Sequence, residues 1–275
     1  MRSTARRSTR RSTRRTALAT ALASAVVPVA VAVGASPAQA ASFTKIEGAA
    51  AHAGGLTPTV DAFRALLGGP NNGSAVGWKP NGRREINWDG VPDNLATPAF
   101  MPRDLFNTAV PRGAVFANSN GNKFQVSADN SNPAGTPVLF ANIKWQNMAN
   151  FRTFSPQRLF TPIGTTVTKV RFFKPGTTTP ATVNGFGAVF TDVDRTDSTK
   201  VELYDRWGNK LWGKNVVKGT APSGSLSFLG VKTTADIYEV RITSGNTPIG
   251  PNATDGGWTD LVVMDDFLYG EPRPL

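Results

Sequence analysis

The sequence predicts an all-β protein, built as a single β-sandwich of jelly-roll type with one short N-terminal helix. From Arg84 onward, apolar residues recur at every second position in short runs rich in β-branched and aromatic residues. Turn-forming residues separate these runs, and no helical pattern lies between them, which favours a sandwich or jelly roll over a parallel sheet. The predicted strands are 85–88, 114–117, 124–127, 139–143, 157–160, 167–173, 186–190, 200–204, 210–213, 225–231, 238–243 and 261–269.

The N-terminal segment is typical of a secretory signal peptide. Residues 1–16 hold seven arginines and no acid, residues 17–35 are uncharged and mostly apolar, and a small-residue Ala-Gln-Ala motif follows at 38–40. We therefore expect cleavage after Ala40 and a secreted, extracellular protein.

The export route and one alternative to secretion stay open at this point. The pair Arg14-Arg15 suits a twin-arginine (Tat) signal, but Ala17 stands where a large apolar residue is usual, so the Sec route is also compatible. A transmembrane anchor is the weaker alternative, because the apolar stretch is Ala-rich and contains Pro28. After cleavage we expect no membrane association.

Behind the signal peptide, the sequence divides into a spacer, a helical segment and the β-domain. An Ala- and Gly-rich composition predicts that the first of these is flexible. A short helix is expected next, since Thr57 can cap it and Pro58 suits its first turn. The expected boundaries are 1–40 for the signal peptide, 41–56 for the spacer, 57–82 for the short helix and loop, and 83–272 for the β-sandwich domain.

Charge and composition exclude several classes of function. The chain has 30 basic and 19 acidic residues, but removal of the seven leader arginines leaves 23 basic residues and a net charge of +4. The remaining basic residues are scattered, so nucleic acid is not an expected partner. The chain has no cysteine, and its one histidine, His52, lies in the predicted spacer. Zinc sites built from His and Cys, and a Ser-His-Asp triad, therefore find no support.

The segment 200–213 predicts a β-hairpin that carries aromatic side chains. Alternation places Val201, Leu203 and Leu211 toward the core, which leaves Tyr204 and Trp212 on the outer face. Exposed aromatic rings offer a flat platform for a sugar or a protein, and the alternative is that they pack across strands or seal an edge. The predicted ligand-binding residues are Tyr204, Trp207 and Trp212, whereas Trp78, Trp88, Trp145 and Trp258 are expected to be structural.

Two adjacent carboxylates, Asp265 and Asp266, interrupt the apolar run that reads as the closing strand. Removing an ionised carboxylate from water costs several kcal/mol, on the order of 20 in the idealised limit, unless a partner compensates it. Because side chains alternate along a strand, we expect the two acids to point in different directions, and at least one to meet a loop backbone, a strand end or a cation.

Several short motifs resemble secreted bacterial jelly-roll proteins whose architecture is similar to carbohydrate-binding modules. They are Ile-Asn-Trp-Asp-Gly at 86–90, the hairpin at 203–211, the strand pair 227–231 and 240–245, and Met-Asp-Asp-Phe-Leu-Tyr-Gly at 264–270, within a likeness that covers about 83–272. In those proteins an acid of the closing strand commonly helps to hold a structural calcium beside the opening strand. The resemblance thus implies calcium as the one cofactor, with Asp265 or Asp266 as a ligand and Asp89 as a contributor.

Hydrogen bonds from backbone N–H groups, or an arginine partner, are the alternative to calcium at these acids. A second acidic run, 192–197, lacks the spacing, the glycine and the distant glutamate of an EF-hand, so we interpret it as a solvated turn.

We predict a non-enzymatic module that binds a glycan or another cell-surface polymer. Two alternatives remain: an extracellular polysaccharide hydrolase or lyase, because a glycosidase needs only two carboxylates, and a structural envelope protein. A groove lined by paired carboxylates would favour the enzyme, and a shallow aromatic surface would favour binding.

Overall fold

The computed structural model describes residues 40–221 and 223–275, and the predicted signal peptide lies almost wholly outside them. Among the described residues, no helix is both long enough and apolar enough to cross a membrane. The elements in this part of the chain are β1 (Phe43–Ala50), α1 (Ala53–Leu67), β2 (Arg83–Ile86), the 3₁₀-helix η1 (Asp93–Leu95), β3 (Ala114–Ala117), β4 (Phe124–Val126), α2 (Asn147–Asn150), β5 (Phe160–Pro162), β6 (Val167–Phe173), β7 (Pro180–Thr191), β8 (Lys200–Tyr204), β9 (Lys210–Asn215), β10 (Leu226–Ile237), β11 (Glu239–Thr243), β12 (Val263–Gly270) and β13 (Arg273–Pro274).

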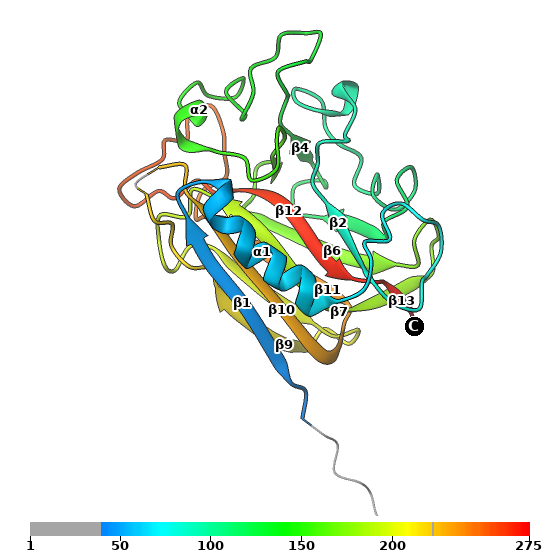
Figure 1. Cartoon of the computed structure of the whole chain (residues 1–275). Helices are drawn as coiled ribbons and strands as arrows, with labels where there is room; N and C mark the ends of the chain where they lie inside the picture. Colours follow the sequence, from blue (N-terminus) through cyan, green and yellow to red (C-terminus); the bar gives the residue numbers. More distant parts are fainter. Residues whose placement is uncertain (1–39, 222) are drawn as a thin grey trace, which may run out of the picture. The chain divides into compact units, whose positions relative to one another are not determined.

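The predicted all-β class is confirmed, and the long strand β7 connects the sheet (Figure 1). One set of strands runs β1-β10-β7-β12, with β2 and β5 on β12 and β4 on β5. The other set runs β3-β6-β11-β8-β9, and the beginning of β7 joins it through β6 and β13. Every pairing between these strands is antiparallel, and together they form one hydrogen-bonded network. The jelly-roll topology itself stays a prediction.

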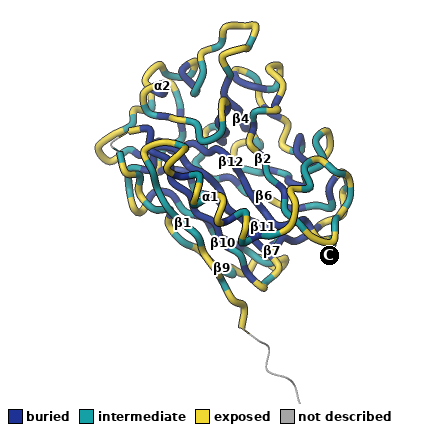
Figure 2. The backbone as a smooth tube through the Cα atoms, in the orientation of Figure 1, coloured by how far each residue is buried: buried dark blue, intermediate teal, exposed yellow. Residues whose placement is uncertain are grey.

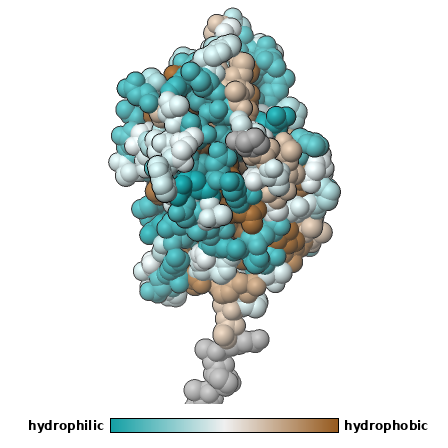
Figure 3. Space-filling view, turned by 90° about the vertical axis from the view of Figure 1, so that its left-hand side faces the viewer, coloured by the Kyte–Doolittle hydropathy of each residue, from teal (hydrophilic) through white to brown (hydrophobic). Residues whose placement is uncertain are grey.

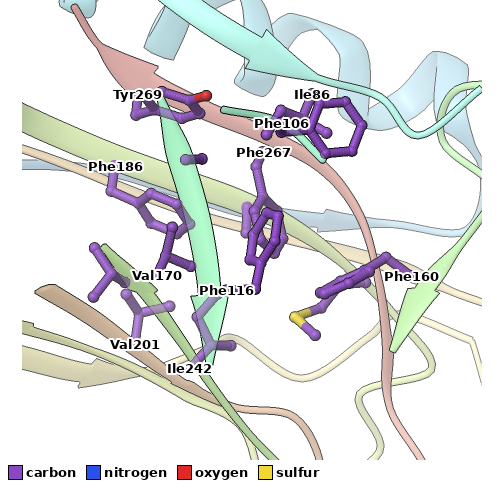
Figure 4. Close-up of a cluster of buried hydrophobic side chains, with 14 of the residues drawn as sticks. Ile86, Phe106, Phe116, Phe160, Val170, Phe186, Val201, Ile242, Phe267 and Tyr269 are labelled. Carbon is purple, nitrogen blue, oxygen red and sulfur yellow. The ribbon is translucent and has the colours of Figure 1, made fainter. Parts of the chain in front are cut away.

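The main core lies between these two sets of strands, as alternation along β7 shows. Phe186, Ala188 and Phe190 belong to this core together with residues of β3, β6, β8 and β11. Figure 4 shows Phe186 with Phe116, Val170, Val201 and Ile242, which come from these four strands. At its centre the Trp88 ring stacks on Phe160, with ring centroids 4.0 Å apart. Every residue of β12 is buried along its whole length from Val263 to Gly270 (Figure 2).

Helix α1 covers the opposite face of β10, β7 and β12 (Figure 1). Its buried side chains pack on Val189, Phe228 and Leu268, which form a second apolar cluster. Phe63 lies over Gly187 and Gly230, which are directly paired across β7 and β10. A Cβ atom at either glycine would lie 2.7 Å from the phenyl ring, so only glycine admits the helix at this distance.

The predicted flexible spacer is instead ordered structure. Residues 43–50 form β1, which pairs with β10, and α1 already begins at Ala53. The small residues serve close packing, because a Cβ atom at Gly48 would lie 2.9 Å from the Thr59 hydroxyl of α1. The β-structure therefore extends beyond the expected 83–272 at both ends, to β1 and β13.

Most other differences are shifts of strand ends, but one predicted strand is absent from the described residues. The stretch 139–143 forms turns, because Leu139 and Phe140 both take positive φ angles, of 54° and 59°, that no β-strand contains. The stretch still contributes to a hydrophobic core, because Phe140 is buried in a small cluster with Phe151 and Leu261. Burial without strand geometry explains why the apolar pattern misleads here.

Candidate functional site

The hairpin of β8 and β9 does not present its aromatic residues as the sequence predicts. Leu203 pairs with Trp212 and Tyr204 pairs with Lys210, so Leu211 is the extra residue of a β-bulge. Residues directly opposite in an antiparallel pair point to the same face, and Trp212 therefore packs against the core beside Leu203. The expectation that Trp212 points outward is wrong, because simple alternation fails at the bulge.

The other two predicted binding residues lie in different surroundings. The Tyr204 ring is half-buried, with the guanidinium of Arg241 3.8 Å from its centroid. Trp207 stands at the tip of the hairpin and is 78% exposed. Asp205 holds this tip by accepting hydrogen bonds from the N–H groups of Trp207 and Asn209, at 2.9 and 2.8 Å. The three aromatic residues therefore do not share one platform.

Asp265 and Asp266 also lie at a bulge. Met264 pairs with Phe190 and Phe267 pairs with Ala188, so the two acids together oppose a single residue of β7. The bulge breaks the alternation that predicted divergent side chains. Both carboxylates instead reach the Ser155 hydroxyl, which lies 3.2 Å from Asp265 and 2.7 Å from Asp266.

Protein donors surround this pair of acids. Asp265 accepts a hydrogen bond of 2.6 Å from the Phe154 N–H, and Asp266 lies 3.6 Å from the guanidinium of Arg64. Burial, followed by the charge of Asp266, raises the pKa of Asp265 well above its usual range. Burial also raises the pKa of Asp266, to about 6, against the hydrogen bond from Ser155.

Asp89 joins the same group, as the resemblance implies, but it too binds the protein. Its carboxylate accepts a hydrogen bond of 3.0 Å from the Arg158 N–H. Burial raises its pKa, and its charge in turn raises those of Asp265 and Asp266. The three predicted calcium ligands thus converge on the loop 154–158 and hold it through hydrogen bonds, which is the alternative that the sequence left open. Calcium at these three residues stays a prediction.

A depression of about 480 Å³ opens beside Asp266. Arg64 and Glu85 line it together with Asp266 and Ser155. The Arg64 guanidinium is 3.0 Å from Glu85 and 3.6 Å from Asp266, so it lies between the two carboxylates. One acid with a raised pKa therefore borders a hollow that a solvent molecule or ligand can enter.

A second depression, of about 320 Å³, lies where the loop between α1 and β2 meets β7 and the C-terminal segment. Trp78 lines it and is 43% exposed, although the sequence predicts a structural role for this residue. Two amide side chains, Asn81 and Asn184, line it as well. Asp236 and Arg273 form an ion pair at its edge. An aromatic ring, amides and charges thus converge on one concave surface.

The loop that carries Trp78 is held by a buried arginine. Arg84 is fully buried, and two of its nitrogens contact the Glu271 carboxylate at 2.8 and 2.7 Å. Three further hydrogen bonds run to carbonyl oxygens of the loop, those of Gly73, Ala75 and Gly77, at 3.0, 2.7 and 3.1 Å. A fourth runs to the Pro111 carbonyl oxygen at 2.8 Å. The sequence pattern gives neither residue a role. Arg84 directly precedes the predicted strand 85–88, and Glu271 comes shortly after the predicted strand 261–269.

The acidic run 192–197 is not a simple solvated turn. Asp192 is fully buried and Asp194 is half-buried, whereas only Asp197 is exposed and pairs with Arg195. The run lies directly after β7, so it begins inside the fold and reaches the surface only at its end.

Comparison with protein-family models, with curated proteins and with solved structures finds no match to this chain. The resemblance to secreted jelly-roll proteins therefore stays a prediction, and any function has to be argued from the geometry alone.

Proposed function

We propose that this protein is a secreted, non-enzymatic module that binds a glycan in the depression beside Trp78. The observation that supports this best is the meeting of a partly exposed indole with amide and charged groups on one concave surface. A sugar ring has an apolar face that stacks on an aromatic side chain and hydroxyl groups that need donors and acceptors around the rim.

Preorganisation adds a second argument for this depression. Binding is weakened by any ordering of the protein that it requires, so a loop that is already fixed binds more tightly. The Arg84–Glu271 pair fixes the loop below Trp78, and the Lys79 N–H donates a further hydrogen bond of 3.2 Å to Glu271. The backbone on both sides of Trp78 is therefore held in place before a ligand arrives.

A glycan array followed by titration of the best ligand tests this proposal. Trp78→Ala should weaken binding by about five- to thirtyfold, since stacking on one aromatic side chain is worth on the order of 1–2 kcal/mol. Trp207→Ala is the matched control, because Trp207 is an exposed tryptophan on a different loop. Binding that survives Trp78→Ala but is lost in Trp207→Ala would move the site to the hairpin, and a wild-type protein that binds no glycan would refute the proposal.

Hydrolysis or lysis of a polysaccharide is the second candidate, and the depression beside Asp266 favours it. A carboxyl group with a pKa near 6 can act as a general acid, and Glu85 supplies a second carboxylate nearby. Release of reducing ends from a panel of polysaccharides, abolished by Asp266→Asn, would support this activity over simple binding.

Export is part of the proposal and rests on the N-terminal sequence. The Arg-rich segment, the apolar stretch and the Ala-Gln-Ala motif together fit signal-peptidase cleavage after Ala40. Mass spectrometry of the protein from the culture medium should find Ala41 as its first residue. Detection of the intact Met1 to Ala40 segment on the exported form would contradict it.

A further inference from the structure

Three carboxylates that are distant in the sequence meet beside the end of β7. Asp194 follows this strand, whereas Asp255 and Asp260 belong to the loop before β12. Each of the three offers a carboxylate oxygen, and these oxygens all lie within 4.8 Å of one another. Asp260 is fully buried, and the other two are half-buried.

A fourth carboxylate, that of Asp192, independently indicates a ligand site beside these three acids. Asp192 is fully buried, and its Oδ1 accepts a hydrogen bond of 2.8 Å from the Gly224 N–H. Its Oδ2 is buried as well but has no hydrogen-bond partner among the described residues. The charges of Asp255, Asp194 and Asp260 all act on it and, after burial itself, raise its pKa to about 8.

The protein supplies only a few neutral donors to this group. Asp260 accepts hydrogen bonds from the Ser198 hydroxyl and, at 3.1 Å, from the Asp194 N–H. Asp255 accepts one of 2.8 Å from the Leu261 N–H. Burial is also the first cause of the raised pKa values of Asp194, Asp255 and Asp260.

Few basic side chains lie near the four acids, and one of them, Arg195, pairs with another acid. Among the described residues, no arginine or lysine forms an ion pair with any of the four acids. Arg195 pairs with Asp197 and lies over the Trp258 ring, 5.0 Å from its centroid, although its charge still acts on Asp260. Lys218 acts on Asp194 at the mouth of the group.

We propose that Asp192, Asp194, Asp255 and Asp260 bind a divalent cation, and that calcium is the ion that fits them. Asp194, Asp255 and Asp260 bring carboxylate oxygens together without a nitrogen or sulfur ligand, which suits calcium. Asp192, on which the charges of these three acids act, adds a fourth carboxylate with a buried, unpartnered oxygen. A bound cation supplies the compensating charge that buried carboxylates need and that the surrounding protein does not provide. An ion can enter from the depression lined by Asp194, Lys218 and Gly256.

This site is separate from both features discussed for function. It shares no residue with the Trp78 depression, and it is not the group of Asp89, Asp265 and Asp266 to which the resemblance assigns calcium. It lies on the side of the molecule that carries the loop before β12, and this side is mostly hydrophilic (Figure 3).

Calcium binding to the purified protein tests the proposal directly. Isothermal titration should give a dissociation constant of about 0.1–1 mM or lower, as in extracellular calcium modules. Calcium in excess should raise the melting temperature by several degrees relative to a chelator, because it binds only the folded state. Magnesium should be much less effective, since it requires a strict octahedral geometry.

Two cluster variants and two control variants locate the ion. Asp194→Asn and Asp255→Asn should each abolish the calcium-dependent rise in melting temperature. Asp197→Asn is the matched control, because this acid lies in the same loop but outside the cluster, and Asp266→Asn is the control for the closing strand; both should retain the rise. Loss of the effect in Asp266→Asn, or its survival in both cluster variants, would overturn the assignment.

Terbium luminescence gives a readout that does not depend on the stability of the cluster variants. A terbium ion at this site should be sensitised by Trp258, which lies two positions before Asp260 in the chain. Trp258→Phe should therefore remove most of the emission and leave the calcium effect on melting unchanged. The proposal fails if the wild-type protein binds neither ion, or if the emission is unaffected by this substitution.

Discussion

Two groups of buried acids in this molecule differ in the donors and positive charge that surround them. At Asp265 and Asp266, a loop hydroxyl, a loop N–H and Arg64 all reach the carboxylates. At the group formed by Asp192, Asp194, Asp255 and Asp260, only neutral donors make contact, and one buried oxygen of Asp192 has no partner among the described residues. Acidic residues alone therefore do not identify a cation site. The supply of donors around them separates a structural group from a binding group.

The first group also shows how buried acids can hold a loop through hydrogen bonds. Asp265 and Asp266 fasten the loop 154–156 onto the middle of β12, and the Trp88 indole donates a hydrogen bond of 2.8 Å to the Asp265 carbonyl oxygen from the core side. The acids thus tie a long irregular segment to β12, which is buried along its whole length.

Removal of Asp265 should have the largest effect on stability. Asp265→Ala leaves the half-buried Phe154 N–H without its acceptor and empties a buried position, so we expect a loss of about 3 kcal/mol in the free energy of unfolding. Asp265→Asn keeps an acceptor for Phe154 and a donor toward Asp266, and it should cost less than about 1 kcal/mol. Urea denaturation at pH 7 measures both. Equal losses in the two variants would show that the charge itself is needed, and would break the distinction between the two groups.

The pH dependence of the free energy of unfolding should show the raised pKa of Asp266. Because the pKa of Asp266 rises from 3.8 to about 6 on folding, the native state binds this proton more tightly than the unfolded state does. The stabilisation is complete below pH 3.8 and is lost as the pH rises through about 6, by up to about 3 kcal/mol. Asp266→Asn should flatten the profile between these values. Parallel profiles for the wild type and the variant would contradict the raised pKa.

A smaller effect is expected from the hydroxyl that both carboxylates share. Ser155→Ala removes a donor to Asp265 and Asp266 and should cost about 1 kcal/mol. Because the Ser155 hydrogen bond lowers the pKa of Asp266, that pKa should also rise further in the variant. Carboxyl carbon NMR follows the titration. A lower pKa in the variant would mean that Ser155 is not a significant donor to this group.

Much of the fold could be predicted from the sequence, because period-two alternation is a local property. The bounds of β3, β6 and β8 agree with the predicted 114–117, 167–173 and 200–204. Alternation fails wherever a bulge inserts one residue, and the orientations of Trp212 and of the Asp265-Asp266 pair were mispredicted for this one reason.

The sites could be predicted only in part. Asp89 was placed beside Asp265 and Asp266 through the resemblance, and the structure brings the three together. The proximity of Asp194 to Asp255 and Asp260 depends instead on the packing of two loops that are distant in the sequence. The spacing of residues in a single sequence does not show which distant loops pack together. The burial of Asp192 was equally hidden, because the acidic run around it resembles an exposed turn.

The contrast between the two groups of acids is tested most directly by the stability of Asp194→Asn, measured by denaturation with and without calcium. In chelator, the substitution removes repulsion within an uncompensated acidic group, so the variant should be as stable as the wild type or more stable by up to about 1 kcal/mol. In excess calcium it removes a ligand, and the variant should become the less stable protein. A change of sign between the two conditions is the predicted result. Equal destabilisation in chelator and in calcium would show that Asp194 is a structural acid like Asp265, and would contradict the account.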